Sequence, residues 1–308
     1  MKRGVERGSR MKRYIASYMK KHGVYYALVA PYMILFTIFV VVPVIISIYY
    51  SFTYYNMLEP ARFLGADNYI RLFTQDDVFL TALKNTVIIA GITGPVSFFL
   101  CFFLAWLIND FRPFVRALFT LAFYIPTITT SMYTIWIFVF HGSRYGILNS
   151  ILLNLNLIDV PIVFLRDPKY MMMVLIVVTL WMSLGTSFLA FIAGFQGLDK
   201  SLFEAAAVEG ISNRWQELWY ITLPIMRPQL MFGAVMQITA AFSVGDVGNQ
   251  LLGFPSIDYA THTILNHLYD YGSVRFELSY ASAIATLLFF MMVGTNKAVN
   301  KLLSKVGR

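Results

Sequence analysis

The side chains best placed to do chemistry lie in a short polar stretch, residues 204–228, between two long apolar runs. Its charged groups include Glu204, Glu209, Arg214 and Glu217, a set that suits charge-assisted contacts with another protein. The sequence contains no G-x-x-x-x-G-K-[S/T] phosphate loop, nucleophile elbow, H-E-x-x-H helix or paired catalytic carboxylates. We therefore expect no catalytic residues, and no enzyme activity, in this chain.

The same stretch specifies a local shape. Residues 202–209 are rich in Ala and Glu, which are good helix formers, and Gly210 follows where a left-handed residue would stop that helix. Ser212 is expected to cap a second short helix that continues through Gln216 and Tyr220. The pattern predicts helix, glycine bend, helix, projecting as a charged knob from a membrane surface.

This stretch resembles the signature loop of the permease subunits of ATP-binding-cassette importers, which reads E-A-A, three residues, Gly, nine residues, I-x-L-P. The matching residues are Glu204, Ala205, Ala206, Gly210, Ile221, Leu223 and Pro224. The lead-in is similar to the carbohydrate-importing, maltose-transporter-type branch of this binding-protein-dependent family, in Trp181, Gly185, Phe191, Ala193, Gly194, Phe195, Gln196 and Leu198. The chain departs from the pattern in Glu209, where Asp is usual, and in a spacer one residue longer before Ile221.

The resemblance implies a role for each part of the loop. Residues 204–216 would form a coupling helix held in a cleft of a separate ATPase. The contact residues it implies are Glu204, Ala205, Ala206, Glu209, Gly210, Arg214, Leu223 and Pro224. The implied partners are a second permease subunit, usually a different chain, an ATPase dimer and an extracytoplasmic solute-binding protein. ATP and Mg would belong to the ATPase, and this chain would hold no cofactor. The implied solute is a sugar or oligosaccharide, with a polyol or glycerol phosphate as the alternative.

Composition sets the broad class. With a mean hydropathy of +0.65, 58% hydrophobic residues and 13% charged ones, the chain has too few polar side chains to cover a soluble globule. The apolar runs are too long for the strands of a β-barrel. The net charge of +8 gathers at the two termini rather than in an aromatic groove, so nucleic acid is not an expected partner, whereas membrane lipid is.

The apolar runs predict an all-α integral membrane protein with six transmembrane helices and a cytoplasmic coupling helix between the fourth and fifth. The expected spans are residues 24–51, 85–108, 114–140, 170–195, 230–248 and 278–296. The expected organisation is a basic segment at 1–22, a first helix and external loop at 23–80, a core permease domain at 81–300 with the coupling loop at 199–228, and a basic tail at 301–308. Both basic ends predict cytoplasmic termini of a multi-pass protein in the cell (inner) membrane.

Polar side chains recur at helical spacing inside the expected spans. They form three sets: Thr127, Ser131 and Thr134; Thr179, Ser183 and Thr186; and Thr239, Ser243 and Asp246, with Gln237 nearby. Sugars bind through hydrogen bonds and aromatic stacking, so these sets are candidates for the lining of a translocation path. The alternative is that small Ser and Thr residues let helices pack closely.

The remaining sequence features argue against other kinds of site and other classes of membrane protein. His22, His141, His262 and His267 have no metal-ligand spacing, and we expect ordinary loop histidines and no metal site. Cys101 is the single cysteine and is expected to pack as a small apolar residue. An ion-coupled secondary transporter would carry ionisable groups near mid-membrane, but the expected span centres are uncharged. A membrane-embedded enzyme or sensor would show a catalytic cluster or a soluble domain.

Overall fold

The computed structural model describes residues 22–129 and 131–305, so the expectations for residues 1–21 and 306–308 lie outside the described residues. Four helices are long and apolar enough to cross a membrane: His22–Tyr50, Asp77–Asn109, Pro168–Gln196 and Leu278–Leu303. Two bent helix pairs meet the same test, Pro113–Ile128 with Tyr133–Val139 and Arg227–Phe242 with Gly245–Leu252. The described chain therefore offers four to six spans by length and composition.

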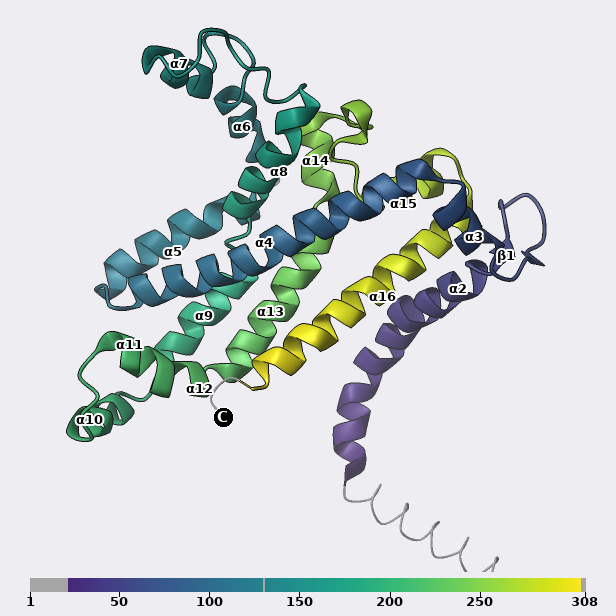
Figure 1. The fold of residues 1–308 in the computed structure, drawn as a ribbon. Coiled ribbons are helices and arrows are strands. Elements are labelled where there is room, and N and C mark those ends of the chain that lie inside the picture. Colours follow the sequence, from purple (N-terminus) through teal and green to yellow (C-terminus); the bar gives the residue numbers. More distant parts are fainter. Residues whose placement is uncertain (1–21, 130, 306–308) are drawn as a thin grey trace, which may run out of the picture.

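The N-terminal part of the described chain forms the first candidate span and a small unit of two strands and a helix. The span contains a π-helical turn, η1 (Thr37–Val41), followed by α2 (Val42–Tyr50). Strands β1 (Thr53–Tyr54) and β2 (Arg62–Phe63) pair antiparallel, and α3 (Asp67–Thr74) follows. In Figure 1 the lower half of the first span diverges from the other helices. Its most apolar window has no residue buried within the chain.

The central elements form a bundle around α4 (Asp77–Asn109), which begins eight residues before the expected second span. The elements that follow α4 are α5 (Pro113–Ile128), α6 (Tyr133–Val139), α7 (Ile147–Asn154), α8 (Pro168–Met182) and α9 (Thr186–Gln196). The polar loop contains α10 (Lys200–Val208), α11 (Arg214–Glu217), the π-helical turn η2 (Leu218–Thr222) and α12 (Leu223–Ile225).

The C-terminal elements complete the bundle. They are α13 (Arg227–Phe242), α14 (Gly245–Leu252), η3 (Ile257–Tyr259), α15 (Ile264–Tyr269), η4 (Asp270–Val274) and α16 (Leu278–Leu303). Helices α4, α13 and α16 run side by side (Figure 1). We call the end of the bundle with α10–α12 the loop end, where the α4–α5 turn and the C-terminal end of α16 also lie. The opposite end, with α3 and α15, is the far end.

Three expected spans are interrupted rather than continuous. The third breaks between α5 and α6, the fourth at 183–185 between α8 and α9, and the fifth at 243–244, where α13 and α14 are bent by 42°. The expectation of a single face for Thr127, Ser131 and Thr134 is therefore wrong, because α5 ends at Ile128 and α6 begins at Tyr133. Pro126 in the last turn of α5 disfavours continuation of the helix.

Close helix contacts hold the loop-end half of the bundle together. Phe102 of α4, Phe188 and Phe191 of α9 and Leu230 of α13 belong to one buried apolar cluster. Gly233 of α13 allows α9 to pack this closely, because a Cβ at this position would lie only 2.4 Å from the ring of Phe191. Small residues at such crossings allow membrane helices to approach closely when no hydrophobic driving force favours their association.

Candidate coupling loop and polar path

The first helix of the loop is built by its caps. Asp199 caps α10 by accepting a hydrogen bond from the Ser201 amide at 3.0 Å, which lowers the pKa of the Asp199 carboxyl. At the other end, Gly210 has a φ of +93° and its amide donates to Ala207, while the Ile211 amide donates to Ala206 at 3.0 Å. These two bonds make a Schellman motif, so the predicted glycine bend is present.

The second helix begins differently from the expectation. Asn213, rather than Ser212, is the N-cap of α11, and its side chain accepts from the Trp215 amide at 3.0 Å. The prediction of Ser212 as the cap is therefore wrong by one residue. The turn after Gly210 uses both Ile211 and Ser212 before the chain re-enters a helix, and Asn is as good a cap as Ser.

Arg214 and Trp215 fasten the loop to the end of α4. Arg214 forms an ion pair with Asp110, and its guanidinium lies 5.1 Å from the ring centroid of Trp106. Trp215 packs against the same Trp106 ring at 5.1 Å. Arg214 was expected to contact an ATPase, but it is engaged within the chain. Asp110 and Trp106 were not predicted, because they lie about a hundred residues away in the sequence.

No other part of the described chain packs over the outer surface of the loop. Glu204, Ala205, Glu209 and Gly210 are exposed, and Val208 is 89% exposed. Among the eight expected contact residues, Ala206 alone is buried, and Leu223 and Pro224 are half-buried at the start of α12. Val208 is therefore an exposed apolar side chain between two exposed carboxylates.

The break between α8 and α9 gathers several of the expected path residues. Its unpaired carbonyls accept hydrogen bonds from neighbouring helices, as they must within a membrane. Thr127 of α5 donates to the carbonyls of Met182 and Leu184, at 3.2 and 3.1 Å, and Gln237 of α13 donates to that of Ser183 at 3.2 Å. The sequence placed Gln237 among the path residues, but its side chain is only 4% exposed and serves the break instead.

The other expected path residues are not brought to one place. Thr186, Thr239 and Ser243 are exposed, and the last two donate to carbonyls of the preceding helical turn. Ser183 is half-buried and donates to Leu180 at 2.6 Å. The hydroxyl of Thr179 is buried without a hydrogen-bond partner among the described residues.

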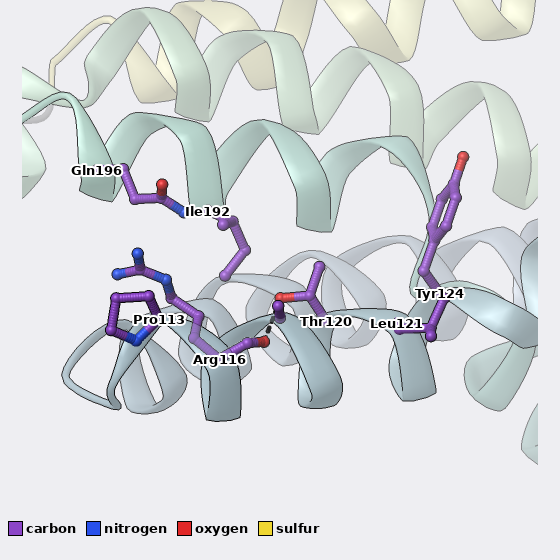
Figure 2. A pocket seen from close by; sticks show the side chains of 8 residues that line it. Pro113, Arg116, Thr120, Leu121, Tyr124, Ile192 and Gln196 are labelled. Carbon is purple, nitrogen blue, oxygen red and sulfur yellow. Dashed lines mark hydrogen bonds between the residues drawn. The ribbon is translucent and has the colours of Figure 1, made fainter.

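A polar pocket near the loop end was not predicted. It has a volume of about 390 Å³ and lies between α5 and α9. Figure 2 shows Arg116, Thr120 and Tyr124 following one face of α5, with Gln196 of α9 beside them. The spacing of four residues between Arg116, Thr120 and Tyr124 is the signal in the sequence that could have revealed this stripe.

A buried polar cluster at the far end was also missed. We call Asp76, His262, His267 and Tyr280 the histidine network. His267 Nε2 lies 3.0 Å from Asp76, the Tyr280 hydroxyl donates to Asp76 at 2.7 Å, and His262 lies 3.4 Å from His267. Both histidines are buried. The expectation of loop histidines is wrong for His267, which lies in α15, whereas His262 lies in the turn before that helix. Within residues 22–129 and 131–305, no three His, Cys, Asp or Glu side chains converge to hold a metal ion.

The network sets the charge state of its members. Burial alone would raise the pKa of Asp76, but hydrogen bonds from His267, Tyr280 and the Phe79 amide outweigh it and hold this pKa below its usual range. Burial, with the neighbouring His267, lowers the pKa of His262 to about 4. Asp76 also caps α4, so the network fixes the start of the central helix.

The helical bundle, its interrupted spans and its protruding loop define a membrane permease. No protein-family model matches the chain. The chain is 31% identical over 283 residues to the probable ABC transporter permease protein YesP of Bacillus subtilis, covering 87% of this chain and 86% of that protein. It is 27% identical to the lactose transport system permease protein LacF of Rhizobium radiobacter, covering 86% and 88% of the two chains.

One solved structure has the same fold. It belongs to a bacterial ABC transporter involved in the import of the acidic polysaccharide alginate, with a TM-score of 0.75, 24% identity, and coverage of 96% of this chain and 100% of that chain. The chain belongs to the ABC transporter permease family. This confirms the family that the 204–228 motif predicted.

Proposed function

We propose that this chain is the permease subunit of an ATP-driven importer for a sugar or oligosaccharide, with six spans and the loop end in the cytoplasm. The single observation that carries the proposal is the loop surface around Gly210. It presents exposed carboxylates and Val208 on a helix that is capped at both ends, and no other part of the described chain covers these side chains. A partner that supplies basic and apolar groups would complete it.

ATP hydrolysis is assigned to a separate subunit. The loop is fixed to α4 through Asp110 and Trp106 and continues directly into α13, so a displacement of α10 by the ATPase would reach two helices of the core. In this proposal ATP and Mg bind the ATPase dimer, a second permease completes the passage, and a solute-binding protein meets the far end. A structure of the alginate importer holds a periplasmic protein loaded with alginate pentasaccharide.

The test is co-purification and uptake with Glu204→Lys. We expect this variant to insert into the membrane, lose most of the bound ATPase and lose ATP-driven uptake, because the docking surface has changed sign. Asp159→Lys makes the same charge change on an exposed residue of the loop before α8, and it should retain both properties. Wild-type ATPase binding by Glu204→Lys would contradict the proposal.

Uptake conditions separate this function from an ion-coupled transporter. We expect uptake to stop when ATP is depleted and to continue in the presence of a protonophore. The opposite result would support ion coupling.

A further inference from the structure

A pocket at the far end combines an apolar lining with a few polar side chains, as small-molecule sites do. It lies between α14 and the α15–η4 segment and has a volume of about 400 Å³, within the range of about 300–1,000 Å³ typical of small-molecule sites. Asp246, Asn249, Tyr269 and Ser273 contribute to its lining. Asp246, Tyr269 and Ser273 are exposed, so these groups are not consumed by the packing of the bundle.

Each of these side chains offers a different contact. The Asp246 carboxylate can accept from two neighbouring hydroxyls. The Oδ1 of Asn249 accepts from Asn266, which leaves the Asn249 amide nitrogen as a donor. Tyr269 is 53% exposed and supplies an aromatic ring, which makes an edge contact with Phe254 at 5.6 Å between the ring centroids. Acceptors, a donor and a ring together match a polyhydroxylated ring.

The pocket shares one residue with the polar set of the fifth span. Thr239, Ser243 and Asp246 are all exposed although they lie in or beside apolar helices. Exposed polar groups in a membrane span are expected to face a polar path or a partner rather than lipid. Asp246 lies beyond the 42° bend between α13 and α14, and of the three it is the one that lines the pocket.

The charge of the pocket lining bears on which solutes can bind there. Of the residues that line the pocket, Asp246 is the single charged one, and the nearby Arg275 is engaged by Asp270 at 2.7 Å. A phosphate or carboxylate on the solute would meet an uncompensated negative charge here. We infer that this pocket is a far-end subsite of the import path for an uncharged polyhydroxylated solute, a neutral sugar rather than a glycerol phosphate or an acidic saccharide. The inference rests on the proposed importer function.

The test uses the assembled importer, with its partner subunits, in proteoliposomes. Radiolabelled lactose and arabinotriose serve as neutral probes, and glycerol 3-phosphate as the anionic probe. We expect ATP-driven uptake of a neutral probe and less than a tenth of that rate for glycerol 3-phosphate. Asp246→Asn and Tyr269→Ala should each raise the KM for the neutral probe about tenfold, Tyr269→Phe should restore the wild-type KM, and Asp246→Lys should shift selectivity toward glycerol 3-phosphate.

Asp258→Asn is the matched control, because Asp258 is an exposed acid of the same end outside the pocket, and its KM should equal that of the wild type. A KM unchanged by both Asp246→Asn and Tyr269→Ala, or equal uptake of glycerol 3-phosphate by the wild type, would overturn the subsite. Absence of ATP-driven uptake of all three probes would instead overturn the proposed importer function.

Discussion

At the loop end Glu204 and Glu209 stand exposed on α10, whereas at the far end Asp76 and His267 are buried against each other with 10% and 2% of their side chains exposed. The loop is shaped by local caps, and neither Glu204 nor Glu209 forms an ion pair with another described residue. The histidine network joins residues about two hundred positions apart and satisfies their polar groups. The difference indicates that the far end is held by contacts within the chain, and it supports the proposal that another protein binds the loop end.

Removal of Asp76 should have the largest effect on stability. Asp76→Ala leaves His267 and Tyr280 buried without their partner and uncaps α4, which should cost about 3 kcal/mol. The measurement is the thermal unfolding midpoint of the purified protein in detergent. Asp77→Ala changes the exposed neighbour and should cost less than about 0.5 kcal/mol. Equal midpoints for the two variants would show that the network does not hold the far end.

Acidification should lower the stability of the far end, where His262 lies. Because the pKa of His262 is lowered to about 4, the unfolded chain binds more protons than the folded chain between about pH 6.5 and pH 4. Stability should therefore fall as the pH falls through this window, by on the order of 2 kcal/mol. The groups acting on His262 are His267, Asp270, Asp76 and Arg275. Asp76, with its lowered pKa, retains its contribution until the pH drops below the unfolded value of about 3.9.

The acid effect is checked by unfolding midpoints at pH 7 and pH 4.5 for the wild type and His262→Asn. The variant loses the group that titrates, so its midpoint should change less between the two pH values. A wild-type midpoint that rises on acidification would contradict the role of His262.

Gly210 tests the loop end through backbone conformation alone. No atom lies within 4 Å of a Cβ built there, so a larger side chain has space, and the cost comes from the φ of +93°. Gly210→Val should cost about 1–2 kcal/mol locally and reduce ATP-driven uptake at least fivefold. Gly210→Asn should retain more than half of the uptake, because Asn tolerates this region. Equal uptake by Gly210→Val and Gly210→Asn would show that transport does not depend on the backbone bend at Gly210.

The ion pair between Arg214 and Asp110 should give the smallest change. Both side chains are about half exposed, at 55% and 52%, so the pair is screened by water and salt. Arg214→Ala should cost less than about 1 kcal/mol, and Arg214→Lys should recover part of this, because Lys keeps the charge but not the planar stacking on Trp106. Hydrogen exchange across residues 199–228 would report the loosening. Unchanged exchange in Arg214→Ala would show that the pair does not anchor the loop.

Sequence reasoning succeeded where structure is local. The helix that stops at Gly210 depends on neighbours within ten residues, and a conformational rule for glycine was enough to place the bend. The same reasoning failed by one residue at Asn213, because two adjacent residues were both able to cap. The apolar runs predicted long apolar helices, of which four to six are suited to cross a membrane, but not their interruptions. The break between α8 and α9, for example, is stabilised by Thr127 and Gln237 from other helices.

The far-end sites were out of reach for a different reason. His267 meets Asp76, and His262 meets His267, because the start of α4 packs against α15, a contact across about two hundred residues. The five-residue spacing of His262 and His267 predicts no shared helix face. In the structure, the turn before α15 brings the two rings into contact. Their burial could not be inferred from a segment that is polar in sequence.

The most direct test of the central claim is cysteine protection on the loop. Val208→Cys introduces a thiol at a position that is 89% exposed, and the single native cysteine, Cys101, is fully buried. Leu58→Cys is the control at the far end, where the native side chain is 88% exposed. We predict that bound ATPase slows maleimide labelling of Val208→Cys at least tenfold and leaves Leu58→Cys unchanged. Equal labelling of Val208→Cys with and without the ATPase would contradict the proposal that this loop is where the ATPase binds.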